Sequence, residues 1–123
     1  MSATFTKKLL MNAYARGVTM DGLQGNRLYL VTANGIIIGQ PVFEKEENDV
    51  NVRVIQGLIE GATKAVAEAE PERLPKDVFP EYLVLKDVRI EKNGVVSARF
   101  PVLTVFCDQI IGMTIGNTNG SNG

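Results

Sequence analysis

The chain has 123 residues, of which 45% are apolar and 22% are charged. This length and composition predict a single soluble globular domain and exclude a chain that is disordered throughout. The net charge of −1, from 13 lysines and arginines against 14 aspartates and glutamates, excludes an overall positive field that would attract phosphate backbones, although basic residues can still gather on one face.

The residues that support catalysis and metal binding are scarce. The chain has no histidine and one cysteine, Cys107, which excludes Ser-His-Asp catalysis, Cys-His catalysis and an intramolecular disulfide. Neither GxxxxGK[ST] nor GxGxxG occurs, and the carboxylates of Asp87, Asp108 and residues 44–49 are interpreted as solvated groups. We therefore expect no enzyme activity, no cofactor and no metal site, and a Cys107 that packs as a small apolar residue.

Nothing in the sequence indicates a membrane span or a secretion signal. No apolar run approaches the roughly 20 residues that a transmembrane helix needs, and the first 17 residues hold only a short, broken apolar segment with no convincing cleavage site. The expected location is the cytoplasm.

The first predicted element is a helix over residues 4–17 that ends at Gly17. Side chains three to four residues apart predict its apolar face: Phe5, Leu9, Leu10, Ala13 and Tyr14. A β-hairpin follows, with strands at 28–32 and 36–42 and a type I′ turn at Asn34-Gly35, because that turn favours residues that tolerate positive φ. Gly39 inside the second strand suggests a bend or a close backbone approach.

Residues 43–80 are predicted to be an insertion that contains a second helix. Asn48 or Asp49 can cap this helix, and apolar residues of helical period support it from about Arg53 onward, although the alternating valines at 50–54 could begin as a strand. Gly57 and Gly61 suggest close helix packing. The prolines at 71, 75 and 80 then predict an extended connector over residues 71–80.

The last third predicts three further strands, at 81–92, 95–106 and 110–115. Turns are expected at Asn93-Gly94 and at residues 107–109. Residues 117–123 contain no apolar anchor and are expected to be disordered. The predicted organisation is a single domain over 1–116 with the insertion at 43–80.

Three segments resemble the motifs of the Sm-like proteins. ANGIIIGQPV at 33–42 is similar to the first motif, with Gly35 and Gly39 at its glycine positions, and EYLVLKDVRI at 81–90 is similar to the strand that ends it. VFCDQIIGMTI at 105–115 resembles the second motif. The resemblance implies a mainly β fold with α: an N-terminal helix and then a small five-stranded antiparallel Sm-like (SH3-type) barrel. A weaker similarity is to the accessory proteins of gas vesicles, and the divergent phage-encoded Sm-like proteins are another group to which the sequence could belong.

The resemblance also implies a single-stranded RNA-binding surface. Tyr82 stands where the family commonly has a base-binding Asn, and Phe106-Cys107 replaces the family's Arg-Gly. Tyr82 and Phe106 could stack on bases, but core packing is the favoured interpretation. The candidate RNA-binding residues are Asn34, Tyr82, Lys86, Phe106, Cys107 and Asp108.

Assembly is expected because the last two strands carry no lysine or glutamate to protect an exposed sheet edge. The resemblance implies a cyclic homo-oligomer of about five to seven copies, in which one copy's fourth strand pairs with its neighbour's fifth. The predicted interface residues are Val102, Leu103, Val105, Ile110, Ile111, Met113 and Ile115. The alternative function is a structural or protein-binding ring without RNA, whose helical insertion contacts a protein partner.

Overall fold

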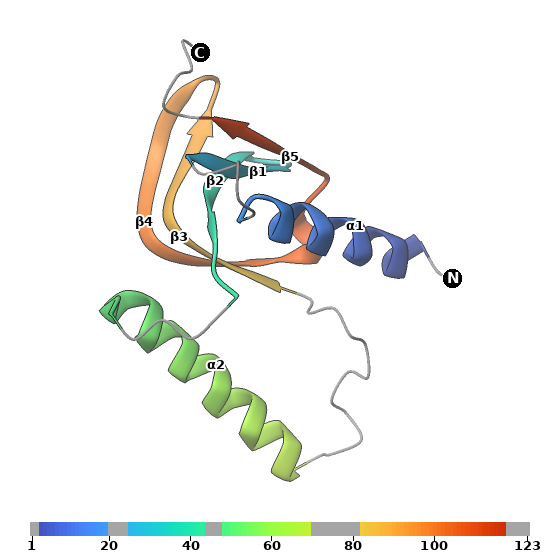
Figure 1. Cartoon of the computed structure of the whole chain (residues 1–123), viewed down its shortest axis with the longest axis vertical. Helices are drawn as coiled ribbons and strands as arrows, with labels where there is room; N and C mark the ends of the chain where they lie inside the picture. The colour runs from blue at the N-terminus through green and yellow to red at the C-terminus, as the bar shows by residue number, and fades with distance from the viewer. Residues whose placement is uncertain (1–2, 20–24, 44–47, 70–81, 118–123) are drawn as a thin grey trace. The chain divides into compact units, whose positions relative to one another are not determined.

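The computed structural model describes residues 3–19, 25–43, 48–69 and 82–117 (Figure 1). The chain forms two compact units, one from residues 1–43 and 79–123 and the other from residues 44–78. The predicted connector at 71–80 and the end of the predicted disordered tail, 118–123, lie outside the described residues. Asn117, which was assigned to that tail, belongs to the last strand instead.

The larger unit is built on five antiparallel strands, which confirms the predicted order of elements (Figure 1). They are β1 (Asn26–Thr32), β2 (Gly35–Pro41), β3 (Tyr82–Lys92), β4 (Val95–Phe106) and β5 (Gly112–Asn117), in the spatial order β4-β3-β2-β1-β5. Within the described residues β4 and β5 are the two edges and do not pair with each other. The sheet is therefore open, and the predicted barrel is not closed within this chain.

The two hairpins use the same Asn-Gly dipeptide differently. Between β3 and β4, Asn93 and Gly94 form a two-residue loop with φ values of 53° and 78°, as a type I′ turn requires. Between β1 and β2, Thr32 lies opposite Gly35, so the loop is Ala33-Asn34 and neither residue has a positive φ. The type I′ turn predicted at Asn34-Gly35 is therefore wrong.

The Thr32 hydroxyl stabilises this different turn. It donates a hydrogen bond of 2.9 Å to the carbonyl oxygen of Gly35 and accepts one of 3.3 Å from the backbone N–H of Asn34. These local side-chain bonds hold the loop without positive φ values. They also fix the position of Asn34 at the tip of the hairpin.

Gly39 marks a close approach between β2 and β3, as predicted. The register of the two strands shifts between Ile38 and Gln40. A Cβ added at Gly39 would lie 3.0 Å from Cγ2 of Val88 and 3.2 Å from Cβ of Leu85. A side chain at this bulge would therefore require Val88 and Leu85 to shift.

Helix α1 (Ala3–Gly17) confirms the first predicted helix but buries a different face. Met11 and Ala15 are buried, whereas Leu9, Leu10 and Tyr14 are 40%, 54% and 45% exposed. The predicted apolar face is therefore wrong for these three residues. The helix carries two apolar faces. The buried one contains Met11 and Ala15 and is continued by Val18 just beyond the helix.

The core of the larger unit joins Met11 and Ala15 of α1, and Val18 just after it, to the strands and the last turn. Its buried members in the strands and the last turn are Leu28, Leu30, Leu83, Leu85, Val88, Val105, Cys107 and Ile110. Cys107 is only 6% exposed, so the prediction that it packs as an apolar residue is confirmed.

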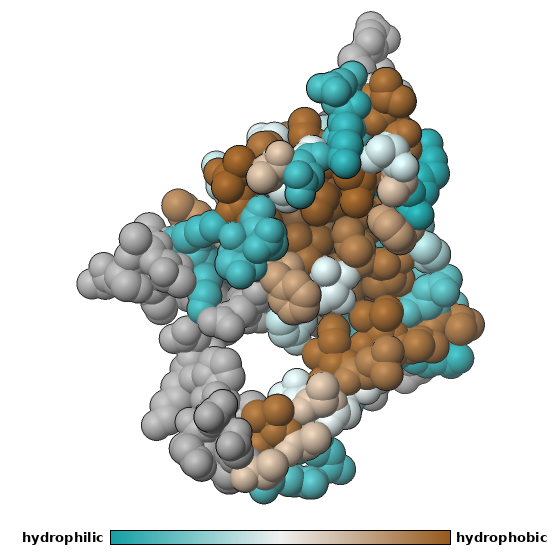
Figure 2. Space-filling view, turned by 180° about the vertical axis from the view of Figure 1, so that it is seen from behind, coloured by the Kyte–Doolittle hydropathy of each residue, from teal (hydrophilic) through white to brown (hydrophobic). Residues whose placement is uncertain are grey.

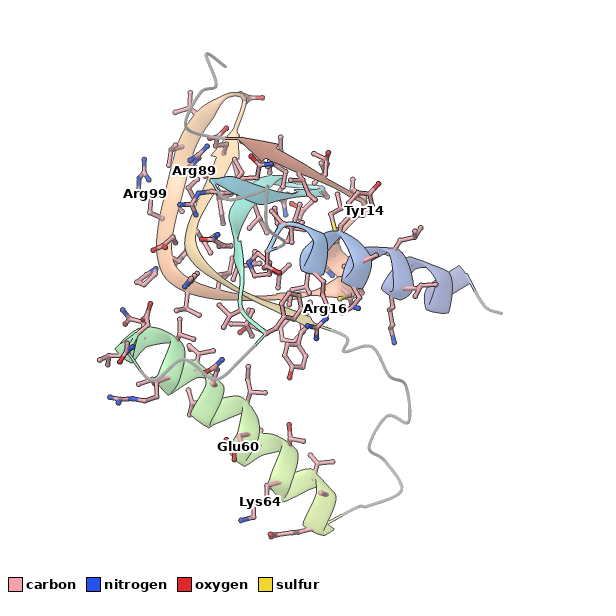
Figure 3. All side chains as sticks on the ribbon, in the orientation of Figure 1. Tyr14, Arg16, Glu60, Lys64, Arg89 and Arg99 are labelled. Carbon is pink, nitrogen blue, oxygen red and sulfur yellow. The ribbon has the colours of Figure 1, made fainter. Side chains whose placement is uncertain are left out.

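A cation–π contact ties the end of α1 to the chain that follows β2. The guanidinium carbon of Arg16 lies 4.1 Å from the centre of the Phe43 ring, and Figure 3 shows Arg16 at the C-terminal turn of the helix. Phe43 also packs against the core. The first residue of the predicted insertion thus belongs to the larger unit.

Helix α2 (Val50–Ala69) confirms the second predicted helix. Its start is capped by Asp49, whose Oδ1 accepts a 3.2 Å hydrogen bond from the N–H of Val52. The helix includes Val50, so the alternative of a strand at 50–54 is wrong. A Cβ added at Gly57 or Gly61 meets no described atom within 4 Å, so the predicted close packing at these glycines is not found.

The apolar side chains of α2 form an exposed stripe (Figure 2). Val50, Val54, Leu58 and Val66 are 59%, 54%, 65% and 41% exposed. Neither described helix is long and apolar enough to cross a membrane.

Candidate nucleic-acid interface

A groove of about 550 Å³ opens in the larger unit between the β1–β2 turn, the β3–β4 hairpin and the turn after β4. We call it the Asn34–Phe106 groove. Its apolar lining comes from β2, β3 and β4, with Ile37, Ile90 and Leu103 among the lining residues. All three side chains are partly buried, and Ile37 and Leu103 also pack against the core.

Polar groups stand among the residues that line this groove. Asn34 comes from the β1–β2 loop, Thr104 from β4, Lys92 from the end of β3 and Gln109 from the 3-10 turn that follows β4. Asparagine and glutamine carry both donors and acceptors on one planar amide, which suits the edges of nucleobases. The groove therefore combines apolar surface with hydrogen-bonding groups of the kind that recognises unpaired bases.

The structure brings two of the predicted RNA-binding residues together, since both Asn34 and Phe106 line the groove. Tyr82 lies directly opposite Phe106 in the β3–β4 register but is not among the described lining residues. Lys86 lies further along β3, opposite Gln40 and Val102, and is also outside the groove.

The last two predicted residues lie in the short 3-10 turn Cys107–Gln109. Asp108 is exposed, whereas Cys107 is buried in the core, so the thiol presents almost no surface to a ligand. Gln109 lines the groove and was not predicted. Its signal was a polar residue in the predicted turn, but nothing in the sequence placed that turn beside the β1–β2 loop.

Phe106 is the most accessible aromatic ring near the groove. It is 61% exposed and lies between Val105 and Cys107, which are 5% and 6% exposed. The alternation of a strand sends its side chain away from the core. Core packing of Phe106, the favoured interpretation of the sequence, is therefore wrong.

The predicted interface residues divide into buried and accessible ones. Val105 and Ile110 belong to the chain's own core, so their side chains offer a partner little surface. Ile111 is 71% exposed, while Met113 and Ile115 are partly buried against the core. Within the described ranges, the outer backbone edges of β4 and β5 pair with no other strand, and these edges are the main feature that could pair with another copy.

Within the described ranges, no group of three or more His, Cys, Asp or Glu residues is placed to hold a metal ion.

Neither the comparison with protein-family models nor that with curated proteins finds a match. Among solved structures, the chain is similar to the Sm protein of Pyrococcus abyssii in complex with a uridine heptamer, with 10% sequence identity and a TM-score of 0.40. The match covers 74% of this chain and 83% of the other. The comparisons give no support to a phage or gas vesicle origin.

Proposed function

We propose that this protein binds single-stranded RNA through the Asn34–Phe106 groove and that its role is binding rather than catalysis. The observation that carries the proposal is that Asn34, Phe106 and Gln109, which come from separate turns and a strand end, line one groove. Its volume of about 550 Å³ falls in the range of small-ligand sites, about 300–1,000 Å³.

The chemistry of these side chains suits unpaired bases. An aromatic ring can stack on any base, and amide side chains can bond to the base edges that become accessible when a strand is unpaired. Lys92, which also lines the groove, can lie near a phosphate of the same strand. The three segments that resemble Sm-like motifs, two of which include Asn34 or Phe106, support the same class of ligand.

The experiment is an NMR titration of ¹⁵N-labelled protein with a short oligo-uridine. We expect the side-chain amide signals of Asn34 and Gln109 to shift, and the Asn34→Ala variant to bind more weakly. Asn51→Ala, which removes an exposed asparagine from α2, is the matched control and should bind like the parent. If neither the Asn34 nor the Gln109 side-chain amide signal shifts when oligo-uridine is added, the proposal is contradicted.

We also propose that the protein forms a cyclic homo-oligomer through the edges of β4 and β5. The support is that both edges are unpaired within the described chain and that neither strand contains a lysine or glutamate. A head-to-tail pairing of two different edges closes into a ring when the rotation between copies divides a full turn.

A second candidate function is protein binding through α2. It is favoured by the exposed apolar stripe Val50, Val54, Leu58 and Val66, because an amphipathic helix can lay such a stripe into a partner's groove. Deletion of residues 47–70 tests it: a chain that keeps every binding partner after this deletion does not use α2 as its contact surface.

A further inference from the structure

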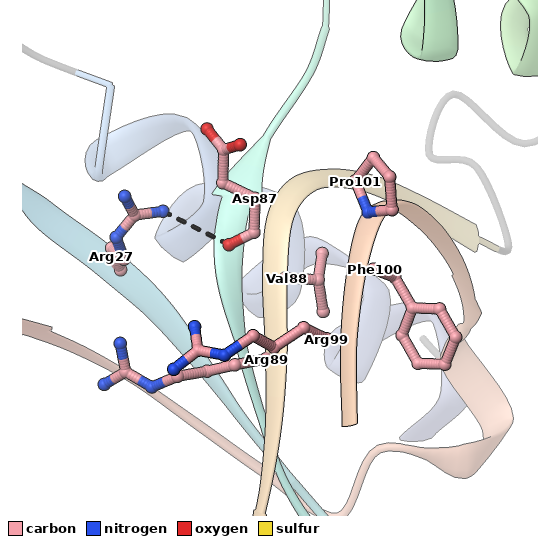
Figure 4. Close-up of a pocket in the computed structure, with 7 residues that line it drawn as sticks. All are labelled: Arg27, Asp87, Val88, Arg89, Arg99, Phe100 and Pro101. Carbon is pink, nitrogen blue, oxygen red and sulfur yellow. Dashed lines mark hydrogen bonds between the residues drawn. The ribbon is translucent and has the colours of Figure 1, made fainter. Parts of the chain in front are cut away.

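A second hollow, of about 490 Å³, lies in the larger unit where arginines from three strands meet (Figure 4). Arg27 comes from β1, Arg89 from β3 and Arg99 from β4, and the hollow is also lined by Asp87, Val88, Phe100 and Pro101. We call it the arginine pocket. It shares no lining residue with the Asn34–Phe106 groove.

The arrangement of Arg89 and Arg99 is electrostatically unfavourable. Arg89 and Arg99 are direct partners in the β3–β4 register, and Figures 3 and 4 show both side chains extending to the same side of the sheet. Like charges directly opposite each other on neighbouring strands are destabilising. The chain has six arginines and a net charge of −1, so the placement of three of them in one pocket is a local concentration of positive charge.

The described acidic groups neutralise this charge only in part. Nε of Arg89 lies 2.7 Å from Oε2 of Glu91, which forms an ion pair. Arg27 donates a long hydrogen bond of 3.4 Å to the backbone carbonyl oxygen of Asp87, while the Asp87 carboxylate points away from Arg89 and Arg99 in Figure 4. No described residue forms an ion pair or hydrogen bond with the exposed guanidinium of Arg99.

The backbone at Asp87 is adapted to this arrangement. Its φ of 52° is one of two positive values among the described residues other than glycine. This conformation turns a residue out of the regular ladder, and it places the carbonyl oxygen that receives Arg27 in the pocket. The long Arg27 contact leaves donors of the guanidinium available, since arginine has five N–H groups.

From this geometry we infer that the arginine pocket binds a phosphate group, either on a nucleotide or in a nucleic-acid backbone. The planar guanidinium donates two parallel N–H groups, which match the oxygens of a phosphate. A phosphate between Arg89 and Arg99 replaces their repulsion with two charge-assisted contacts. The inference does not depend on RNA binding at the Asn34–Phe106 groove.

The test is an NMR titration that follows the arginine Nε–Hε signals. The probes are inorganic phosphate, adenosine monophosphate and an oligo-uridine without terminal phosphate, each at low ionic strength. We expect at least one probe to shift the Arg89 and Arg99 signals. A response to the first two probes assigns the site to a terminal phosphate, and a response to the oligo-uridine alone assigns it to the nucleic-acid backbone.

Three variants make the test specific. Arg99→Gln removes an exposed guanidinium that forms no ion pair or hydrogen bond with a described residue, so the protein should stay folded and bind the probe at least about tenfold more weakly. Arg53→Gln, which removes an exposed arginine from α2, should bind like the parent. Glu91→Gln releases Arg89 from its ion pair and should strengthen binding.

Two results would overturn the inference: no probe shifts these signals, or Arg99→Gln binds as tightly as Arg53→Gln. Phe106→Ala separates the two sites, because it alters the groove and leaves the arginine pocket intact. Loss of oligo-uridine binding in Phe106→Ala with phosphate binding unchanged would support both sites separately. Phosphate binding that persists without any groove binding would contradict the proposed function and still support the arginine pocket.

Discussion

Phe106 lies directly opposite Tyr82 at the end of the β3–β4 ladder, and the Phe106 ring is 61% exposed while the next residue, Cys107, is 6% exposed. Two adjacent residues therefore place one side chain on the surface and the next in the core. Large exposed aromatics are more informative than buried ones, since burial alone explains a core residue. This position motivates the first prediction.

Phe106→Ala is expected to weaken oligo-uridine binding by about 1–3 kcal/mol, the free energy of stacking one base on an aromatic ring. Fluorescence anisotropy with a labelled oligonucleotide measures this change. Tyr14→Ala is the matched control, because Tyr14 is an exposed aromatic on α1 that lines neither hollow. Equal affinities for the two variants would remove Phe106 from the binding surface.

Ile111→Lys is expected to prevent assembly. Ile111 is 71% exposed just before the edge strand β5, and a lysine beside an unpaired edge opposes strand pairing between copies. Size-exclusion chromatography with light scattering compares the mass of this variant with that of Leu58→Lys, which alters an exposed residue on α2. If only Leu58→Lys dissociates the oligomer, α2 and not the strand edge forms the interface.

Gly35→Ala is expected to lower the free energy of unfolding by about 1–3 kcal/mol, the cost of a strained backbone conformation. Gly35 has a φ of 148°, and an added Cβ would lie 2.7 Å from the carbonyl oxygen of Glu91. Gly57→Ala should instead stabilise α2 by about 1 kcal/mol and so increase the helix content. Its added Cβ meets no described atom within 4 Å. Urea unfolding followed by circular dichroism measures both effects.

The Cys107 thiol is expected to react slowly with an aromatic disulfide reagent in the folded protein and rapidly in denaturant. Its side chain is 6% exposed and belongs to the core cluster. Rapid labelling under native conditions, at the rate of a free thiol, would show that the end of β4 opens readily.

The sequence predicts elements better than faces or turns in this protein. Alternating apolar residues and Asn93-Gly94 predict the β3–β4 hairpin correctly, because a type I′ turn depends on two neighbouring residues. The same dipeptide at residues 34–35 misleads because the Thr32 hydroxyl stabilises a different turn. The choice between the Leu9 and Met11 faces of α1 depends on what packs against the helix, which local periodicity does not contain.

The candidate sites also depend on contacts that local sequence patterns do not contain. Asn34 and Phe106 were found through local motifs, but their meeting in one groove with Gln109 depends on contacts between distant segments. The arginine pocket is even harder to predict from the sequence. Arg27 and Arg89 are separated by 61 positions (89 − 27 − 1), and only the register of β3 with β4 places Arg89 opposite Arg99.

The most direct test of the central claim is analytical ultracentrifugation of the purified protein with labelled oligo-uridine and oligo-adenine at two salt concentrations. The proposed function predicts that the label sediments with the protein, and less so at high salt because phosphate contacts release bound counterions. Label that sediments as free oligonucleotide at both salt concentrations would contradict RNA binding.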